Sequence, residues 1–480
     1  MTDITLVRNA RFAIAWDAQT QQHVYRTDVD VAFAGGEITY VGPAYAGPPP
    51  IRVIEGRDLM VMPGLVDLHA HPSSEPLNKG MWDEVGSRNL YNTSLYEYLT
   101  VLRPDAEGIR ACYGVALSEL LLSGVTTLCD LSMPSEGWLD ILAASGLRVC
   151  IAPMFRSGRW FTRNGHRVEY EWDEKAGYEA FEAAMREIEK AVQHPSGRLS
   201  GMVAPAQIDT CTPDLLRDSY AEAERRRLSF QIHTAQSLAE FHEITRRHGM
   251  TPVGWMKHLG ILGPRSILGH AIFLDHHPWT HWPDAGTDLL LLAEAGATVA
   301  HCPTVFARRG IALDHFGRYR RAGVNMGIGT DVYPHNMLDE MRLASYVARV
   351  VVGNPRDTMV ADIFAAATVG GARALGRDDI GRLAPGCKAD LVLVDCAHPM
   401  MRPCRDPLRS LVYSASERAV RHVFVDGAQV VRDGRVLTID YAAAAAALEE
   451  AQRRALERIP TLDWAGRTAD RIAPPALPWA

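Results

Sequence analysis

A regular alternation of short apolar runs and helix-like segments between residues 64 and 375 constrains the fold of this chain more than any other feature. Helix-like segments such as 106–124 and 177–194 separate the runs. Continuous apolar strands separated by helices are typical of a parallel sheet whose faces are covered. The pattern therefore predicts an α/β fold, a TIM-like (β/α)8 barrel rather than an open sheet. The eight predicted strands are 64–70, 124–131, 148–155, 201–208, 228–234, 266–273, 297–303 and 324–331.

The two ends of the chain have a different pattern, with short β-like alternations and turn residues such as Gly35 and Gly36. We expect residues 1–62 and 376–440 to build one small composite β-domain beside a catalytic barrel over 63–375. The final segment, 441–480, is expected to be a helix followed by a Pro-rich tail, because its alanine-rich run has strong helix propensity.

Composition limits the partners of this 480-residue chain. A net charge of −7 with no long basic run argues against binding to nucleic acid or to an anionic membrane. Eight scattered cysteines without a CxxC motif predict buried reduced thiols. No signal-peptide pattern and no apolar run of about 18 residues is present in the sequence. We therefore expect a cytoplasmic protein that acts on a small molecule and forms a homo-oligomer, a dimer or larger, with its Pro-rich tail over the surface or a neighbouring subunit.

The stretch PGLVDLHAHP places His69 and His71 two residues apart at the end of an apolar run. In a strand, alternate side chains project from the same face, so both imidazoles point at one spot, as in a divalent-metal site. Barrel enzymes carry their reactive groups at the carboxyl ends of the strands. Four further candidates end predicted strands in this way: His233, His270, His301 and Asp331. Imidazoles and a carboxylate around one metal leave a position for a water, whose pKa falls toward ~7 on binding.

With these motifs the chain resembles the amidohydrolase superfamily, in the branch of cytosine deaminase, S-adenosylhomocysteine deaminase and the s-triazine hydrolases. The resemblance extends over nearly the whole chain and includes PGLVDLHAHP, GVTTLCD, QIHTAQSLAEFHE, GHAIFLD, AHCPT and GVNMGIGTD. It implies that one metal is held by His69, His71, His233 and Asp331. It also implies that His270 orients the attacking water and that Asp331 is the general base. His301 and Gln236 complete the expected catalytic set.

The residues at the end of the fourth predicted strand indicate how many metals the site binds. Relatives with two metals bridge them with a carboxylated lysine or a glutamate at the end of that strand. Here the strand offers only Gln207 and Asp209, and all five lysines lie elsewhere. We expect one divalent metal per chain, with zinc favoured and iron, manganese or cobalt compatible with the same ligands.

One departure from the pattern bears on the substrate. Deaminases of this branch carry H-x-x-E after the fifth strand, and the glutamate protonates a ring nitrogen. Here Gln236 occupies that position, and its amide cannot transfer a proton. This favours a mononuclear hydrolase that cleaves the C–N bond of an amide, urea or carbamate. The alternative is a hydrolytic deaminase or dechlorinase of an aminated heterocycle of the cytosine, guanine or s-triazine type.

Loops that follow the strands supply the candidate substrate contacts. The predicted contacts are Trp82, Arg88, Gln236, Phe306, Tyr333 and His335. Their aromatic members indicate a pocket for an aromatic or apolar group. The connection from 155 to 175 is expected to be a long irregular loop.

Overall fold

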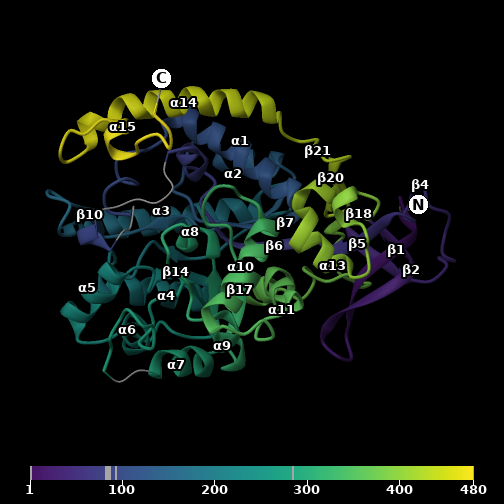
Figure 1. The fold of residues 1–480 in the computed structure, drawn as a ribbon, viewed down its shortest axis with the longest axis horizontal. Coiled ribbons are helices and arrows are strands. Elements are labelled where there is room, and N and C mark those ends of the chain that lie inside the picture. The colour runs from purple at the N-terminus through teal and green to yellow at the C-terminus, as the bar shows by residue number, and fades with distance from the viewer. Residues whose placement is uncertain (1–2, 82–87, 92–94, 284–285, 479–480) are drawn as a thin grey trace.

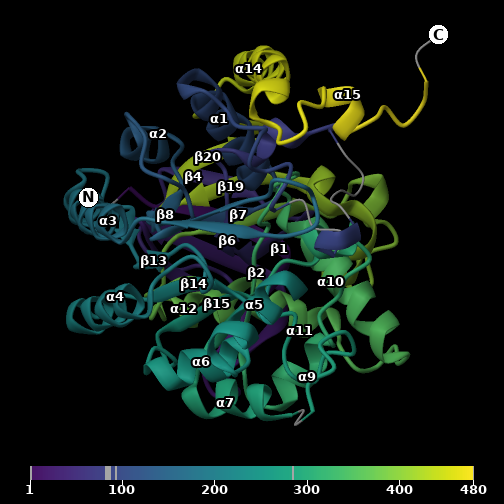
Figure 2. The same ribbon diagram turned by 90° about the vertical axis from the view of Figure 1, so that its left-hand side faces the viewer.

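The computed structural model describes residues 3–81, 88–91, 95–283 and 286–478 of the chain. Two parallel four-stranded sheets and their surrounding helices form the larger part of the molecule (Figure 1). A nine-stranded, mostly antiparallel sheet lies to one side, on the right in Figure 1. Figure 2 shows the parallel strands near the middle of the molecule, with helices outside them.

Strands occur at all eight predicted positions, the third and fourth of them each divided into two short strands. The first sheet has the order β12-β8-β7-β6 and the second β14-β15-β16-β17. The strands are β6 (Leu65–Ala70), β7 (Val125–Asp130), β8 (Arg148–Ile151), β12 (Leu199–Gly201), β14 (Phe230–Thr234), β15 (Ser266–His270), β16 (Thr298–His301) and β17 (Asn325–Ile328), with the short pair β9 (Met154–Phe155) and β13 (Ala204–Pro205). Parallel bridges Ala70–Asp331 and Val203–Phe230 connect strands β6 and β14 to residues just beyond β17 and β12. The predicted parallel α/β architecture is confirmed.

The nine-stranded sheet joins the two ends of the chain. From the N-terminal end come β1 (Thr5–Asp17), β2 (Gln22–Ala34), β3 (Glu37–Gly42), β4 (Arg52–Glu55) and β5 (Leu59–Pro63). From the C-terminal end come β18 (Leu391–Asp395), β19 (Val420–Val425), β20 (Ala428–Arg432) and β21 (Arg435–Val436). Strands β5 and β18 pair antiparallel, so segments more than 300 residues apart share one sheet. Gly36 has a φ of 83° in the turn between β2 and β3, a conformation that glycine adopts without strain.

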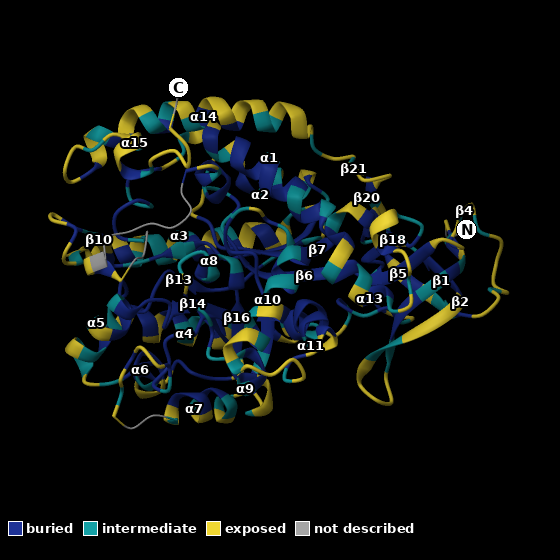
Figure 3. Cartoon of the chain, viewed as in Figure 1, coloured by how far each residue is buried: buried dark blue, intermediate teal, exposed yellow. Residues whose placement is uncertain are grey.

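Helices cover the parallel strands and separate them in sequence. They are α1 (Ala106–Leu122), α2 (Trp138–Ala144), α3 (Glu174–Gln193), α4 (Pro213–Arg226), α5 (Leu238–His248), α6 (Pro252–Leu259), α7 (Thr287–Ala295), α8 (Pro303–Ala307), α9 (Phe316–Arg321), α10 (Met337–Val352), α11 (Val360–Ala365), α12 (Gly371–Ala374), α13 (Pro407–Ser410), α14 (Tyr441–Leu462) and α15 (Ala469–Ile472). The predicted C-terminal helix is α14, which begins where the Asp440 carboxylate accepts a hydrogen bond from the Ala443 N–H. It lies along α1 (Figures 1 and 2), and its outer face is exposed (Figure 3).

The prediction of an irregular loop over 155–175 is wrong. This segment contains an antiparallel pair, β10 (Gly158–Phe161) and β11 (Glu169–Trp172). Trp160 and Tyr170 face each other across the pair, and both donate a 2.8 Å hydrogen bond to the same carboxylate oxygen of buried Asp209. The hairpin is thus held by a residue about 40 positions away, which the local pattern of the sequence does not contain.

Two expectations from composition can be compared with the structure. All eight cysteines are free thiols, seven of them buried and Cys404 half-buried, as predicted. Of the helices that the structure describes, none combines the length and the apolar composition needed to cross a lipid bilayer.

A buried ion pair connects the first parallel sheet to the segment that leads into β18. The Arg148 guanidinium donates to both carboxylate oxygens of Asp390, at 3.1 and 3.2 Å, and to Asp426 at 3.2 Å. The side chains of Arg148 and Asp390 are almost inaccessible to solvent. Removing one partner of such a pair leaves an uncompensated buried charge.

We therefore expect Arg148→Met to lower the free energy of unfolding by about 3–5 kcal/mol, measured by chemical denaturation. The control Arg217→Met breaks an exposed pair with Asp214 on α4 and should leave stability nearly unchanged. Equal stability of the two variants would contradict the structural importance of the Arg148 pair.

Candidate metal centre

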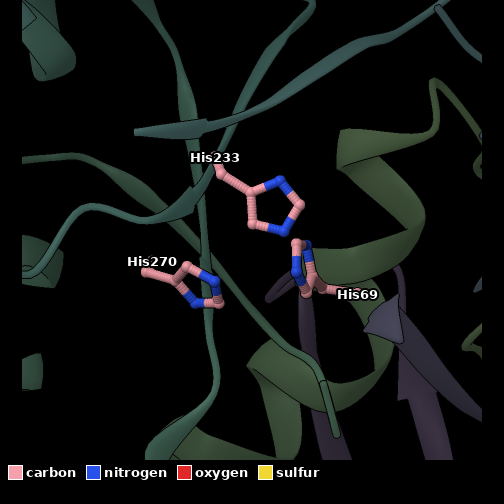
Figure 4. A group of neighbouring side chains, drawn as sticks. All are labelled: His69, His233 and His270. Atoms are coloured by element: carbon pink, nitrogen blue, oxygen red, sulfur yellow. The ribbon is translucent and has the colours of Figure 1, made fainter. Parts of the chain in front are cut away.

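Four imidazoles and one carboxylate from different strands converge at the carboxyl ends of the parallel sheets. The Asp331 carboxylate lies 3.4 Å from His71 Nε2 and 3.7 Å from the Nε2 atoms of His69 and His270. His71 Nε2 and His233 Nε2 are 3.2 Å apart. Figure 4 shows the rings of His69, His233 and His270 pointing toward one another. The structure thus brings together five of the six strand-end groups that the sequence singled out.

Hydrogen bonds fix the proton position on three of these rings. His71 Nδ1 lies 2.7 Å from the Leu131 carbonyl, and His233 Nδ1 lies 2.6 Å from the Ala206 carbonyl. Because a carbonyl only accepts, each Nδ1 carries the proton and each Nε2 presents a lone pair. His69 Nδ1 is 2.5 Å from the Gln231 amide oxygen, so the same holds for His69.

These lone pairs are suited to binding a cation. Burial lowers the pKa of His69 to about 3 and holds the pKa of His233 well below its usual range, so both rings are neutral. Among the described residues, His69 Nε2 has no hydrogen-bond partner although it is buried. Three unprotonated ring nitrogens and a carboxylate around one point repel one another unless a positive charge lies between them. Nitrogen and oxygen donors of this kind suit a divalent metal.

Two supporting residues were not predicted from the sequence. The Gln231 amide donates to the Leu68 carbonyl at 3.1 Å, which directs its oxygen at His69. Asp67 is fully buried and accepts hydrogen bonds from the backbone N–H groups of His69 and Thr330, both at 3.1 Å. Each lies two residues before a histidine of the centre on the same strand. That i, i+2 spacing was the signal that could have identified them.

The backbone is strained at two of the converging residues. His270 has a φ of 86° and Asp331 a φ of 57°, in the left-handed region that non-glycine residues seldom adopt. Hydrogen bonds from Asp331 N to the His69 carbonyl, 2.8 Å, and from His71 N to the Asp331 carbonyl, 3.1 Å, hold this geometry. Strain of this kind concentrates at functional sites, where the surrounding structure maintains it.

His301 occupies the end of β16, as the sequence predicted, but belongs to none of the metal-competent groups of three that the described residues form. It is buried, and burial lowers the pKa of its imidazole to about 4. A positive charge on His301 would lower the pKa of His270 further, although burial is the main cause of that lowering.

The predicted substrate contacts have different surroundings. The Phe306 ring packs edge-on against His270, with 4.8 Å between ring centres. Tyr333 lies under the Arg308 guanidinium at 4.4 Å, and His335 is fully buried with Nδ1 2.9 Å from the Thr330 hydroxyl. Trp82 and the side chain of Arg88 lie outside the described residues.

One pocket beside the centre contains two of these residues. Gln236 and Phe306 line it together with Arg309, which the sequence placed with Phe306 and Arg308 in the loop after the seventh strand, where it would approach substrate. Its other walls include the aromatic residues Tyr91, Phe273 and Trp279. Arg309 follows the short helix α8 in that loop.

The chain is similar to known amidohydrolases and deaminases over most of its length. The model of the amidohydrolase family matches residues 60–430. A 5-methylthioadenosine/S-adenosylhomocysteine deaminase of Pelotomaculum thermopropionicum is 29% identical over 91% of this chain and 95% of its own length. A 5'-deoxyadenosine deaminase of Methanothermobacter thermautotrophicus is 30% identical over 81% of this chain and 86% of its own length.

Solved structures share the fold. An adenosine deaminase from Xanthomonas campestris with bound zinc has a TM-score of 0.79 at 24% identity, covering 94% of this chain and 98% of that one. An atrazine chlorohydrolase from Arthrobacter aurescens in complex with zinc has a TM-score of 0.78 at 21% identity, covering 93% and 100%. At these identities the likeness concerns the fold alone.

Proposed function

Since this chain belongs to the amidohydrolase family and is a metal-dependent hydrolase acting on C–N bonds, we propose that it is a hydrolytic deaminase of an aminated nitrogen heterocycle. Adenine nucleosides are the first substrates to test, because the similar proteins named above are deaminases of adenosine derivatives. The single observation that carries the proposal is the convergence of three inward-facing Nε2 lone pairs, His270 and Asp331 beside a pocket with aromatic walls.

This proposal replaces the reading that the sequence favoured. Gln236 pointed to hydrolysis of an amide, urea or carbamate, since no acid stands where deaminases carry one. The comparisons support the alternative instead, because the similarity to deaminases of adenosine derivatives extends over most of the chain. We therefore give the similarity over most of the chain more weight than the identity of residue 236.

In the proposed site, His69, His71, His233 and Asp331 hold one divalent metal, with zinc favoured. When bound, the metal polarises a water and lowers its pKa. Because the Asp331 carboxylate faces the metal donors on one side and His270 on the other, it takes a proton from that water and passes it to the leaving amine. His270 orients the water, and His301 supports His270.

We propose a flat ring as the substrate because aromatic residues line this small cavity beside the centre. Aromatic side chains such as Phe273, Trp279 and Phe306 offer apolar faces and edges to a heterocycle. We assign Phe306 and Gln236 to substrate contact on this basis, and retain Tyr333 and His335 as predictions.

The remaining expectations belong to the same proposal. The bridges between the two parallel sheets support closure into a (β/α)8 barrel over residues 63–375. The pairing of β5 with β18 supports a composite β-domain formed by 1–62 and 376–440, with 441–480 as a C-terminal extension. A homo-oligomer in the cytoplasm remains the expectation for the whole protein.

The direct test is a hydrolysis screen of the protein reconstituted with zinc. Ammonia release is measured from adenosine, 5'-deoxyadenosine, S-adenosylhomocysteine, cytosine and guanine, and amine release from phenylureas and aryl carbamates. We expect ammonia from at least one aminated heterocycle, abolished by a chelator and restored by zinc. Turnover of only the ureas or carbamates would contradict the deaminase proposal and return the assignment to carbonyl hydrolysis.

A further inference from the structure

Hydrolytic deamination requires a group that stabilises negative charge on a ring nitrogen of the substrate. When water adds to the carbon that carries the amino group, an electron pair moves onto the neighbouring ring nitrogen. Gln236 stands at the position of the sequence motif where deaminases of this branch carry an acid, and its amide forms hydrogen bonds but cannot transfer a proton. Another group must stabilise the negative charge as it forms.

The same pocket contains a cationic side chain. Arg309 lines it together with Gln236 and Phe306, and its backbone N–H donates to the Phe306 carbonyl at 2.9 Å. The neighbouring Arg308 is used differently, since its guanidinium donates to the Tyr333 carbonyl at 2.6 Å and covers the Tyr333 ring. Two adjacent arginines therefore have separate environments, and only Arg309 is among the residues of this pocket.

Arg309 also lies within electrostatic reach of the metal centre. Its positive charge lowers the pKa of Asp331 and of Glu75, against the larger effect of burial, which raises both. Glu75 is buried, and its backbone N–H donates to the His71 carbonyl at 3.2 Å. Arg309 is half-buried, and burial lowers the pKa of its guanidinium. A cation in such surroundings interacts strongly with a developing negative charge.

We propose that Arg309 is a catalytic residue that donates a hydrogen bond to the ring nitrogen next to the reacting carbon. It replaces proton transfer from an acid by electrostatic stabilisation of the charge on that nitrogen. The inference rests on the proposed deaminase function and names the group that allows the reaction to proceed with glutamine at position 236.

The reaction balances without a further reactant. The water oxygen bonds to the carbon, the C=N electron pair moves to the ring nitrogen, and the C–N bond to the amino group breaks. Asp331 carries one proton of the water to the leaving ammonia. The second proton goes to solvent as the C=O bond forms, and the ring nitrogen takes up a proton from solvent. Arg309 keeps its protons throughout.

A different role for Arg309 must be distinguished from this one. The same guanidinium could serve only as a counter-ion for Asp331 and Glu75 and so preserve the metal centre. In that case its loss would change metal content or stability, and an acid at position 236 would not compensate for it.

A double-mutant cycle separates the two roles. The wild type, Arg309→Met, Gln236→Glu and the double variant are compared for kcat with adenosine or the best heterocycle, metal content and melting temperature. We expect Arg309→Met to lower kcat about 10²-fold with metal content and melting temperature unchanged. In the Arg309→Met background, Gln236→Glu should restore kcat at least about tenfold, and this gain should exceed the effect of the same substitution with Arg309 present.

The pH dependence provides a second readout. The double variant should lose activity as pH rises through the pKa of its new carboxyl group, because only the protonated form is an acid. The wild type should show no such limb. The metal-loaded proteins should also differ in binding purine riboside, which keeps the ring nitrogen but lacks the amino group. We expect an about tenfold higher Kd for Arg309→Met. Arg356→Met, an exposed arginine without an ion pair to any described residue, is the matched control.

Two kinds of outcome would contradict these proposals. Loss of metal or of folding in Arg309→Met, or absence of rescue by Gln236→Glu, would overturn the role of Arg309 while the wild type still releases ammonia. If the wild type releases no ammonia from any heterocycle, the proposed function fails and this inference fails with it.

Discussion

Replacing Asp331 with asparagine should lower kcat by at least about 10³-fold. The carboxylate lies 3.4–3.7 Å from three Nε2 atoms, and in the proposed mechanism it both binds the metal and takes a proton from the water. Asparagine keeps the size of the side chain but has neither the charge nor a basic oxygen. Steady-state kinetics with the best heterocycle, together with metal analysis, measure the two losses.

The matched control is Asp470→Asn, which makes the same chemical change at an exposed position on α15. It should leave kcat and metal content unchanged. Activity of Asp331→Asn within tenfold of the wild type would remove Asp331 from the proposed mechanism.

Replacing His233 with alanine should remove the metal and, with it, nearly all turnover. The ring is held by its Nδ1–H bond to the Ala206 carbonyl and directs Nε2 to within 3.2 Å of His71 Nε2. Loss of one of three imidazole donors should reduce the metal content to less than about a tenth of one equivalent after dialysis, and kcat at least about 10³-fold.

His270→Ala provides the contrast, because His270 is assigned to the water. It should keep most of the metal and lose most of the rate. The donor atoms of His69, His233 and His270 also lie within 4.8 Å of one another, so the geometry alone admits His270 as a ligand. Equal metal loss in both variants would show that His270 belongs to the donor set.

The reaction was the least predictable property. The interpretation of Gln236 assumed that the acid of a deaminase must stand at one position of the chain. Arg309 lines the same pocket as Gln236. A cation and an acid can both stabilise charge on a ring nitrogen, so a substitution at one position does not identify the chemistry without its spatial neighbours.

The sequence by itself determined the parallel strands and the groups at their carboxyl ends. Buried strands require continuous apolar runs, and alternate residues such as His69 and His71 share a face, so both are properties of neighbouring residues. Parallel strands bring their carboxyl ends to one side, so His233, His270 and Asp331 could be assigned to one site before their distances were known.

Tertiary structure alone decided how these groups are oriented and which neighbours act with them. The Gln231 oxygen reaches His69 across 162 positions, and Trp160 and Tyr170 form a hairpin because Asp209 accepts from both. Adjacent Arg308 and Arg309 have the same side chain, yet one covers Tyr333 and the other lines the pocket. Contacts between distant segments depend on the packing of whole elements, and no local periodicity in the sequence records that packing.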